Sequence, residues 1–236
     1  MPIGRRQERV WLGTNYADSK YDSENMTDES MTEQYATGSE PQTDDNRRIG
    51  EVMDASTSEF TAQCYRLYDA PEIGSLVMCG QDAPVYGIVH EATTQSIDPG
   101  RAAIPRGMHA ESEADVLHDN PQIERLLCTK FSAVVVGYRD GDAVRRYPPL
   151  IAPRIFSFVR ECDDDELAEF SSSHEFLTLL LAAPIGSQDH VIASFLRRAS
   201  AANTDSHGYL VSAGKSLATM LPGQLQRLSG ILRSLA

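Results

Sequence analysis

The sequence lacks a long hydrophobic run and a surplus of positive charge. Its longest apolar stretch, residues 176–183, stops at Pro184, far short of the roughly 20 residues that a membrane-spanning helix needs. No apolar segment follows the arginines near the N-terminus, so we expect no secretory signal. The 21 basic and 34 acidic residues give a net charge of −13. Nucleic-acid binding by the whole chain is therefore not expected, because phosphate contacts need clustered Lys and Arg.

Cysteine is also scarce. No C-x-x-C pair occurs, which excludes a zinc ribbon or a thioredoxin-type motif. Cys64, Cys79 and Cys128 have apolar neighbours and Cys162 does not. We predict buried free thiols, with a disulfide between two of the four as the alternative. Together with the missing signal, this cysteine usage favours a cytoplasmic location.

Catalytic motifs are absent or incomplete. Gly214-Lys215-Ser216 looks like the end of a phosphate-binding loop, but the required earlier glycine is replaced by Tyr209. His174-Glu175 begins an H-E-x-x-H pattern, but the second ligand position is Thr178. For the first motif we therefore predict a solvated helix face. For the second we predict a helix start capped by Ser172 and Glu175. We assign no catalytic, cofactor-binding or metal-binding residue, no cofactor and no small-molecule substrate, and we expect no enzyme.

Two clusters keep other functions open. Carboxylates and imidazoles gather in one polar loop, where they could hold a divalent ion: His109, Glu111, Glu113, Asp115, His118 and Asp119. Residues 190–236 hold a single acid and five bases, which could contact nucleic acid: Arg197, Arg198, Lys215, Arg227 and Arg233. Contact of these bases with the acidic N-terminal segment or with an acidic partner is the interpretation that we favour.

The chain divides into three segments. Residues 1–46 carry ten acids and four bases, and their few larger apolar side chains after Asn15 follow no helix or strand period. Such a segment cannot bury enough surface to offset its ordering entropy, so we predict a disordered acidic tail. Met26 and Met31 leave open whether translation starts at Met1 or further in.

Residues 47–162 are predicted to form a small six-stranded β-barrel. Short strands separated by glycine and proline turns favour this fold; they are expected at 48–53, 60–67, 76–79, 85–92, 131–138 and 143–147, with a further short strand at 156–159. Asp140-Gly141 is a typical two-residue hairpin turn. A polar loop precedes the fifth strand, and a short helix over 120–127 is expected to start at Asn120 and Pro121.

Residues 163–236 are predicted to form a helical bundle. Asp163-x-x-Glu166 and Ser172-x-x-Glu175 are capping-box patterns. Three apolar stripes at helical spacing follow: Val191, Ile192, Phe195, Leu196 and Ala199; Leu210, Ala213, Leu217 and Met220; Leu225, Leu228, Leu232 and Leu235. The whole chain is thus expected to be an α+β protein.

The β segment resembles the HAS-barrel, the small barrel shared by HerA-type translocases and the N-terminal domains of rotary ATP synthase subunits. The similar residues are 49–52, 55–60, 72–77, 85–89 and 136–138, together with the prolines of 147–153. The resemblance covers 47–162, about half of the chain. It implies a non-catalytic collar that assembles ATPase subunits or docks a partner. The large ATPase domain of HerA-type proteins has no counterpart in the 74 residues after position 162.

These observations predict a protein–protein interaction or assembly module, an adaptor of a HerA-type ATPase or of another ring assembly, or a self-associating protein. The first alternative is an accessory DNA-processing factor that contacts nucleic acid through its C-terminal helices. The second is an unrecognised metal-dependent enzyme that uses the loop from His109 to Asp119.

The tail is expected to be dispensable for folding. Deleting residues 1–46 removes no periodic apolar side chains, so thermal melts of the full-length and truncated proteins should nearly coincide. A fall in Tm of more than about 5 °C would contradict this expectation by revealing a tail element that is part of the core.

Overall fold

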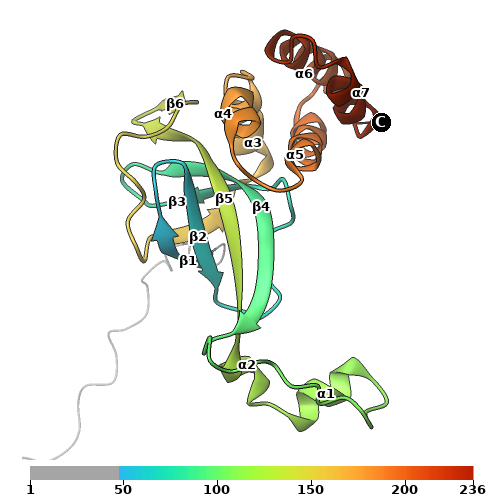
Figure 1. The fold of residues 1–236 in the computed structure, drawn as a ribbon. Helices are drawn as coiled ribbons and strands as arrows, with labels where there is room; N and C mark the ends of the chain where they lie inside the picture. Colours follow the sequence, from blue (N-terminus) through green and yellow to red (C-terminus); the bar gives the residue numbers. More distant parts are fainter. Residues whose placement is uncertain (1–47, 236) are drawn as a thin grey trace, which may run out of the picture. The chain divides into compact units, whose positions relative to one another are not determined.

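The computed structural model describes residues 48–235, so the predictions for residues 1–46 lie outside the described part. Within it the chain forms a mixed α+β fold of seven strands and seven helices (Figure 1). The strands are β1 (Arg48–Ala55), β2 (Glu59–Cys64), β3 (Leu76–Cys79), β4 (Val85–Ser96), β5 (Leu127–Asp140), β6 (Ala143–Arg145) and β7 (Phe158–Glu161). The prediction of an α+β protein is confirmed, and the six expected strands and the further short strand at 156–159 each have a counterpart in the sheet.

The sheet is antiparallel, in the order β2-β1-β7-β3-β4-β5-β6. A further pairing joins its first strand to its sixth: β2 lies antiparallel to β5, with Glu59 opposite Val134 and Gln63 opposite Lys130. The pairings of β2, β1, β7, β3, β4 and β5 therefore run in a closed circuit. β6 pairs with the C-terminal part of β5, outside that circuit.

One hydrophobic cluster takes side chains from all six strands of the circuit. Burial alternates along β2, as expected for a strand with one face in a core. The cluster consists of Val52, Phe60, Ala62, Cys64, Val77, Cys79, Val85, Val89, Phe131, Ala133, Val135 and Val159. Gly87 lies among these residues, and a Cβ there would come within 2.6 Å of the Phe60 ring and 2.9 Å of Ala133 Cβ. The circuit thus closes around a packed interior that has no room for a side chain at Gly87.

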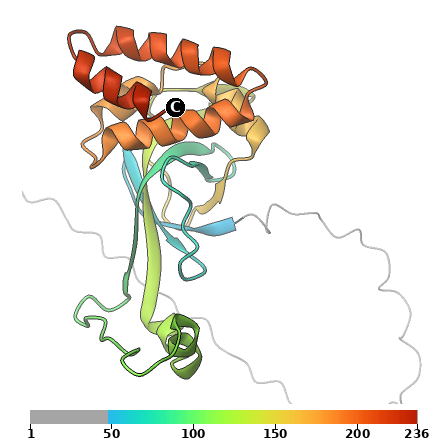
Figure 2. The same cartoon turned by 90° about the vertical axis from the view of Figure 1, so that its right-hand side faces the viewer.

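The opposite face of β3, β4 and β5 packs against helices. Leu76, Met78, Tyr86, Ile88, Val134 and Val136 belong to a second cluster whose other buried members lie between Leu167 and Ile231. The helices are α3 (Asp164–Ser171), α4 (Leu177–Ala182), α5 (Gln188–Ala202), α6 (Ser206–Met220) and α7 (Leu225–Arg233). These three strands are therefore buried on both faces, and Figure 2 shows the helices stacked over one end of the strands.

The predicted stripes of α5 and α6 are confirmed. All five stripe residues of α5 are buried, as are Ala213 and Leu217 in α6. The stripe predicted for the last helix is wrong, because Leu225 is 73% exposed and Leu232 39% exposed. α7 instead buries Ile231, with Leu228 and Leu235 packed beside it. The spacing of the leucines could not show which face of α7 is buried, because Ile231 forms an equally regular stripe with Leu228 and Leu235.

Strands β4 and β5 continue beyond the circuit as a two-stranded arm, in which Thr94–Ser96 lies opposite Leu127–Thr129. Its end carries α1 (Glu113–Asp119) and α2 (Ile123–Leu126), as Figures 1 and 2 show.

The helix predicted over 120–127 is wrong in its start. Asn120 ends α1, where its side-chain amide donates to Val116 O, and α2 starts only at Ile123. α1 itself was expected to be loop; Ser112 caps it by accepting from Asp115 N.

One of the two predicted capping boxes is present. Asp163 accepts from Glu166 N, and the Glu166 side chain accepts from Asp163 N. The second prediction is wrong: Ser172 is the C-cap of α3 and donates to Glu169 O, while α4 starts without a side-chain cap. A serine can serve either helix end, and here an arginine bound to its hydroxyl oxygen favours the C-terminal role.

No helix between residues 48 and 235 is long and apolar enough to cross a membrane.

Gly87→Ala is expected to lower the free energy of unfolding by about 1–3 kcal/mol, because the new methyl group must displace Phe60 or Ala133. Gly230→Ala is the control. A Cβ at this position in α7 meets nothing within 4 Å, so the change should stabilise by about 0.5–1 kcal/mol. Urea unfolding measures both, and an unaltered Gly87→Ala protein would contradict the packing of the interior.

Candidate interaction surface

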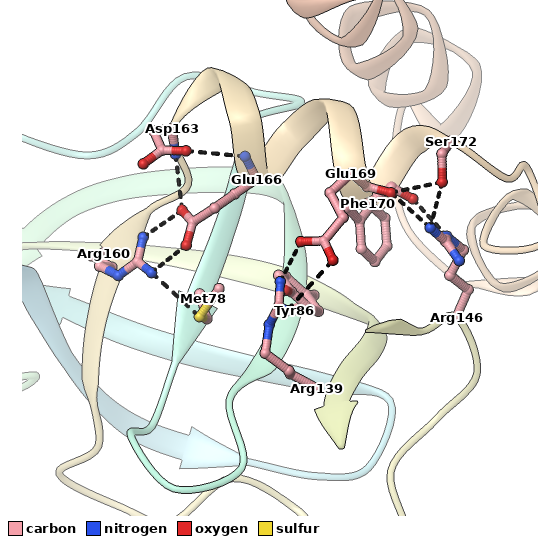
Figure 3. A network of polar contacts seen from close by, with 10 residues as sticks. All are labelled: Met78, Tyr86, Arg139, Arg146, Arg160, Asp163, Glu166, Glu169, Phe170 and Ser172. Atoms are coloured by element: carbon pink, nitrogen blue, oxygen red, sulfur yellow. Dashed lines mark hydrogen bonds and ion pairs between the residues drawn. The ribbon is translucent and has the colours of Figure 1, made fainter. Parts of the chain in front are cut away.

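Two arginines of the sheet bind carboxylates of α3 (Figure 3). Arg160 in β7 donates to both oxygens of Glu166, at 2.7 and 2.6 Å. Arg139 in β5 bonds Glu169 and donates from Nε to Tyr86 Oη at 3.1 Å. Hydrogen bonds from Arg160 hold the pKa of Glu166 below its usual range, against the opposing effect of burial. These contacts fix α3 against β4, β5 and β7.

A third arginine, Arg146, ties the segment after β6 to the end of α3. Its Nε donates to Phe170 O at 2.6 Å, and its Nη2 donates to Glu169 O at 2.7 Å and to Ser172 Oγ at 2.9 Å (Figure 3). The last carbonyls of a helix have no partner within it, and the guanidinium satisfies two of them. The start of the segment 146–157 is thereby held in place.

The other end of this segment is held by β1. Phe156 N donates to Val52 O at 2.8 Å, and Val52 N donates to Ser157 O at 2.9 Å. Between the two attachments lie Pro148, Pro149 and Pro153, each with a ring that fixes the backbone φ angle. The segment therefore has little conformational freedom to lose when something binds it.

This constrained segment displays large apolar side chains to solvent. Leu150 is 96% exposed, Ile151 79% and Phe156 65%, and three more are at least one-third exposed. We call the six together the proline-loop surface: Tyr147, Leu150, Ile151, Ile155, Phe156 and Phe158. Phe156 has a φ of +66°, a region that bulky residues rarely adopt. The backbone strain thus presents an aromatic ring outward and does not serve to bury it.

We call the segment 146–157 the proline loop. An open groove of about 390 Å³ lies between this loop and the turn that joins β3 to β4. Ile151, Phe156 and Phe158 line one side, and Cys79 and Val85 line the other. Gly80 N donates to Phe158 O across it at 3.2 Å. The groove is in the size range of pockets that receive side chains or small ligands. Its lining combines these apolar side chains with Gln81, Asp82 and Arg154.

All four cysteines are free thiols, and Cys64, Cys79 and Cys128 are buried, as predicted. Burial raises the pKa of Cys79 to about 12 and that of Cys64 to about 11. Thiols with such pKa values are poor nucleophiles at neutral pH. Although Cys79 lines the groove, its role there is therefore packing.

The incomplete motifs fall in ordinary helical surroundings. Gly214-Lys215-Ser216 lies in the middle of α6, with Lys215 exposed. His174 lies before α4, and its Nδ1 is 3.2 Å from Ser216 Oγ, a pairing that sequence reasoning missed because 42 residues separate the two. Burial lowers the pKa of His174, and its Nε2 is buried without a hydrogen-bond partner. A neutral imidazole packed beside Tyr209 accounts for these features.

The loop with candidate metal ligands is spread out. The six residues from His109 to Asp119 are all exposed: two precede α1, Glu113 and Asp115 lie in its first turn, and His118 and Asp119 lie in its last turn. Within residues 48–235, no group of three His, Cys, Asp or Glu side chains could hold a metal ion.

The C-terminal bases partly serve internal contacts. Arg198 pairs with Glu161 at 3.3 Å and with Glu72 at 3.5 Å, and Arg227 pairs with Asp189 at 2.8 Å. Arg197 donates to Ser234 O at 2.7 Å. These pairs reduce the positive charge that the helices offer to phosphates.

A second groove, of about 550 Å³, lies at the end of the β4–β5 arm. Ile104, Val116, Ile123 and Leu126 line it, with Arg101 and Arg106 among the other lining residues. Neither the groove nor α1 was expected, because the polar composition of this region suggested a loop.

Arg146→Ala is expected to lower the free energy of unfolding by about 1–2 kcal/mol, because it removes three hydrogen bonds from a charged donor. Trypsin should also cleave faster after Arg154, within the loosened loop. The control is Arg145→Ala, at an exposed neighbour whose contact with Asp140 spans 3.5 Å. Equal effects of the two substitutions would contradict the anchoring role of Arg146.

His174 is expected to make stability depend on pH. Because folding lowers its pKa, the unfolded chain takes up the proton first as the pH falls below about 6.5. The free energy of unfolding should therefore decrease from pH 7 toward pH 5, and the decrease should be smaller in His174→Gln. Glu166, whose pKa is also lowered, acts in the more acidic range. Denaturant unfolding at a series of pH values measures this; identical profiles for the two proteins would contradict it.

Comparison with known proteins gives no relative: no family model matches this chain, and no curated protein matches it. The HAS-barrel resemblance therefore stays a prediction, and the functional argument rests on the surfaces described above.

Proposed function

We propose that the protein is a non-catalytic protein–protein interaction module, in which a small barrel of the HAS type carries the proline-loop surface as its docking site. The partner is a protein, either a ring ATPase of the HerA type or a second copy of this chain. The module binds neither a cofactor nor a small-molecule substrate.

The closed circuit of strand pairings supports the barrel. Each of its six strands contributes side chains to one interior cluster, and small barrels fill their interior in this way. At Gly87, inside the segment that resembles the HAS-barrel, the interior leaves no room for a Cβ. An interior filled by its own side chains leaves recognition to the outer surface.

The observation that carries the proposal is Phe156. A phenylalanine with positive φ costs free energy, and such strain persists where the surroundings enforce it, often at functional positions. Here the hydrogen bond to Val52 enforces it, yet the ring stays 65% exposed. Neighbouring exposed Leu150 and Ile151 extend the apolar area. Exposed apolar groups gathered in this way mark interaction sites, and aromatic residues dominate the energetics of such sites.

The two alternatives have less support. The ion pairs of Arg198 and Arg227 leave a weaker basic surface for nucleic acid than the sequence suggested. The dispersed, exposed residues from His109 to Asp119 offer no enclosed site for metal-dependent chemistry.

The test is a double substitution, Leu150→Asp with Ile151→Asp, in the full-length protein. Both side chains are exposed, so circular dichroism and Tm should stay unchanged. If the partner is a HerA-type ATPase from the same genome, the affinity for it should fall at least tenfold. If the partner is a second copy, the mass in light scattering should fall to that of a monomer. The tenfold loss corresponds to about 1.4 kcal/mol.

The matched control is Leu225→Asp, an exposed leucine on α7 that lies outside the proline loop. It should leave binding and mass unchanged. A double variant that binds and assembles like the wild type would contradict the docking site.

A further inference from the structure

We propose that the groove at the end of the β4–β5 arm is a second docking site, and that it binds an acidic amphipathic segment of a protein partner. Such a segment carries carboxylates next to a few large apolar side chains. The groove shares no residue with the proline-loop surface or with the groove beside it. A protein with both sites can hold two partners at once.

The charges of the arm end are sorted with respect to the groove. Residues 97–126 carry six acidic and three basic side chains. Two of the bases, Arg101 and Arg106, line the groove, whereas none of the acids does. Within residues 48–235 neither arginine pairs with a carboxylate, and their one side-chain hydrogen bond runs from Arg106 Nη1 to the amide oxygen of Asn120, at 3.2 Å. The lining is therefore positively charged, and a ligand has to supply the carboxylates.

The apolar side chains of the arm end have no core of their own. No residue from Glu91 to Leu126 is buried, and this range includes both α1 and α2. In the lining of the groove, Ile104 is 73% exposed and Leu126 36%. Helices as short as these are not stable alone, and exposed apolar groups gathered in one place mark interaction sites. A bound partner would cover side chains that the described chain leaves open.

The groove is preformed, because contacts join its two walls. One wall is the loop 101–107, and the other is built by α1 and α2. Asn120 links the walls: its side-chain amide donates to Val116 O at 2.9 Å and its oxygen accepts from Arg106. Gly107 approaches α1 so closely that a Cβ there would come within 2.9 Å of Val116 Cγ2. A partner therefore has little ordering of the groove to bring about when it binds.

The openness of the region favours a protein segment over a small molecule. A volume of about 550 Å³ suits a few apolar side chains or one small ligand. Apolar exposure continues along the chain beyond the lining, with Ile97 53% and Met108 87% exposed. A small ligand confined to the groove leaves these side chains in water, whereas a protein segment can extend over them, as an amphipathic helix does in an apolar groove.

A nucleic acid fits the arm end less well. Its backbone presents negative charges at regular intervals along its whole length. The six carboxylates of residues 97–126 would repel every phosphate that does not meet Arg101 or Arg106. A protein segment, by contrast, can place carboxylates at the two arginines alone.

The experiment selects random peptides displayed on phage against the full-length protein, after depletion on Arg101→Glu/Arg106→Glu. The selected peptides should combine Asp or Glu with large apolar residues. Their affinities are measured by fluorescence polarisation, and Arg101→Glu should lower them about tenfold or more. Arg125→Glu is the matched control, because it makes the same change at the third base of the arm end, which is exposed and does not line the groove. It should bind like the wild type.

A second pair of variants tests the apolar part of the groove. Ile104→Asp places a carboxylate on the groove wall and should weaken binding as Arg101→Glu does. Leu225→Asp, at a side chain of α7 that is also 73% exposed, should not. All these side chains are exposed, so circular dichroism and Tm should stay unchanged. A peptide with Lys in place of each Asp and Glu should bind Arg101→Glu/Arg106→Glu and not the wild type.

The proposal is overturned if no peptide survives the depletion, if the survivors lack acidic residues, or if Arg101→Glu and Arg125→Glu weaken binding equally. A labelled oligonucleotide that binds the wild type but not Arg101→Glu would also overturn it, by identifying the ligand as a nucleic acid. The selected peptides should bind Leu150→Asp/Ile151→Asp normally. The second docking site and the proline-loop surface therefore fail or hold separately.

Discussion

Burial of β3, β4 and β5 on both faces is the constraint on which the rest of the structure depends. Side chains of one face fill the interior of the strand circuit, and those of the other face pack against α3 to α7. Tyr86 connects the two layers: its ring lies 4.9 Å from that of Phe170, which in turn lies 5.4 Å from Phe176. Strands and helices thus share the second cluster, and neither layer would cover its apolar face alone.

The polar contacts around α3 follow from this packing. A helix held against a sheet by apolar contacts alone can slide or rotate, whereas paired carboxylate–guanidinium contacts fix its position. Arg160 with Glu166 and Arg139 with Glu169 provide such pairs at two points along α3. Arg146 then uses the helix end as an attachment for the proline loop. The position of the proline-loop surface therefore depends on how α3 packs against the sheet.

Periodicity predicted the parts of the fold that depend on local chemistry. The strand expected at 60–67 and found as β2, the stripe of α5, the Asp163 capping box and the Asp140-Gly141 turn each reflect neighbours in sequence; Gly141 in that turn has a φ of +58°. Sequence could not show which face of α7 is buried, because Leu225 and Ile231 are equally apolar and the choice depends on α5 and α6. The pairing of His174 with Ser216 likewise depends on helix packing.

The candidate surface was hidden for a related reason. In sequence, the prolines of 147–153 indicated that strand pairing stops and formed part of the HAS-barrel resemblance, and a short strand was expected at 156–159. No pattern marked Leu150, Ile151 and Phe156 as exposed side chains. Their exposure follows from the two attachments at Arg146 and Val52, which are contacts between distant segments. A positive φ at a phenylalanine has no sequence signature at all, because the residues that favour it are glycine and asparagine.

The arrangement of strand edges explains why recognition should use side chains. A closed circuit of pairings leaves few backbone groups free for an added strand. Within the described part, free edges include the three residues of β6, Leu127–Thr129 of β5, and β4 beyond Val89, where Glu91, Thr93 and Thr94 are polar and exposed. None of these edges offers the long apolar strand that β-strand addition requires. The proline loop, by contrast, presents apolar side chains on a backbone that is already fixed, so a partner gains their burial at little cost in ordering.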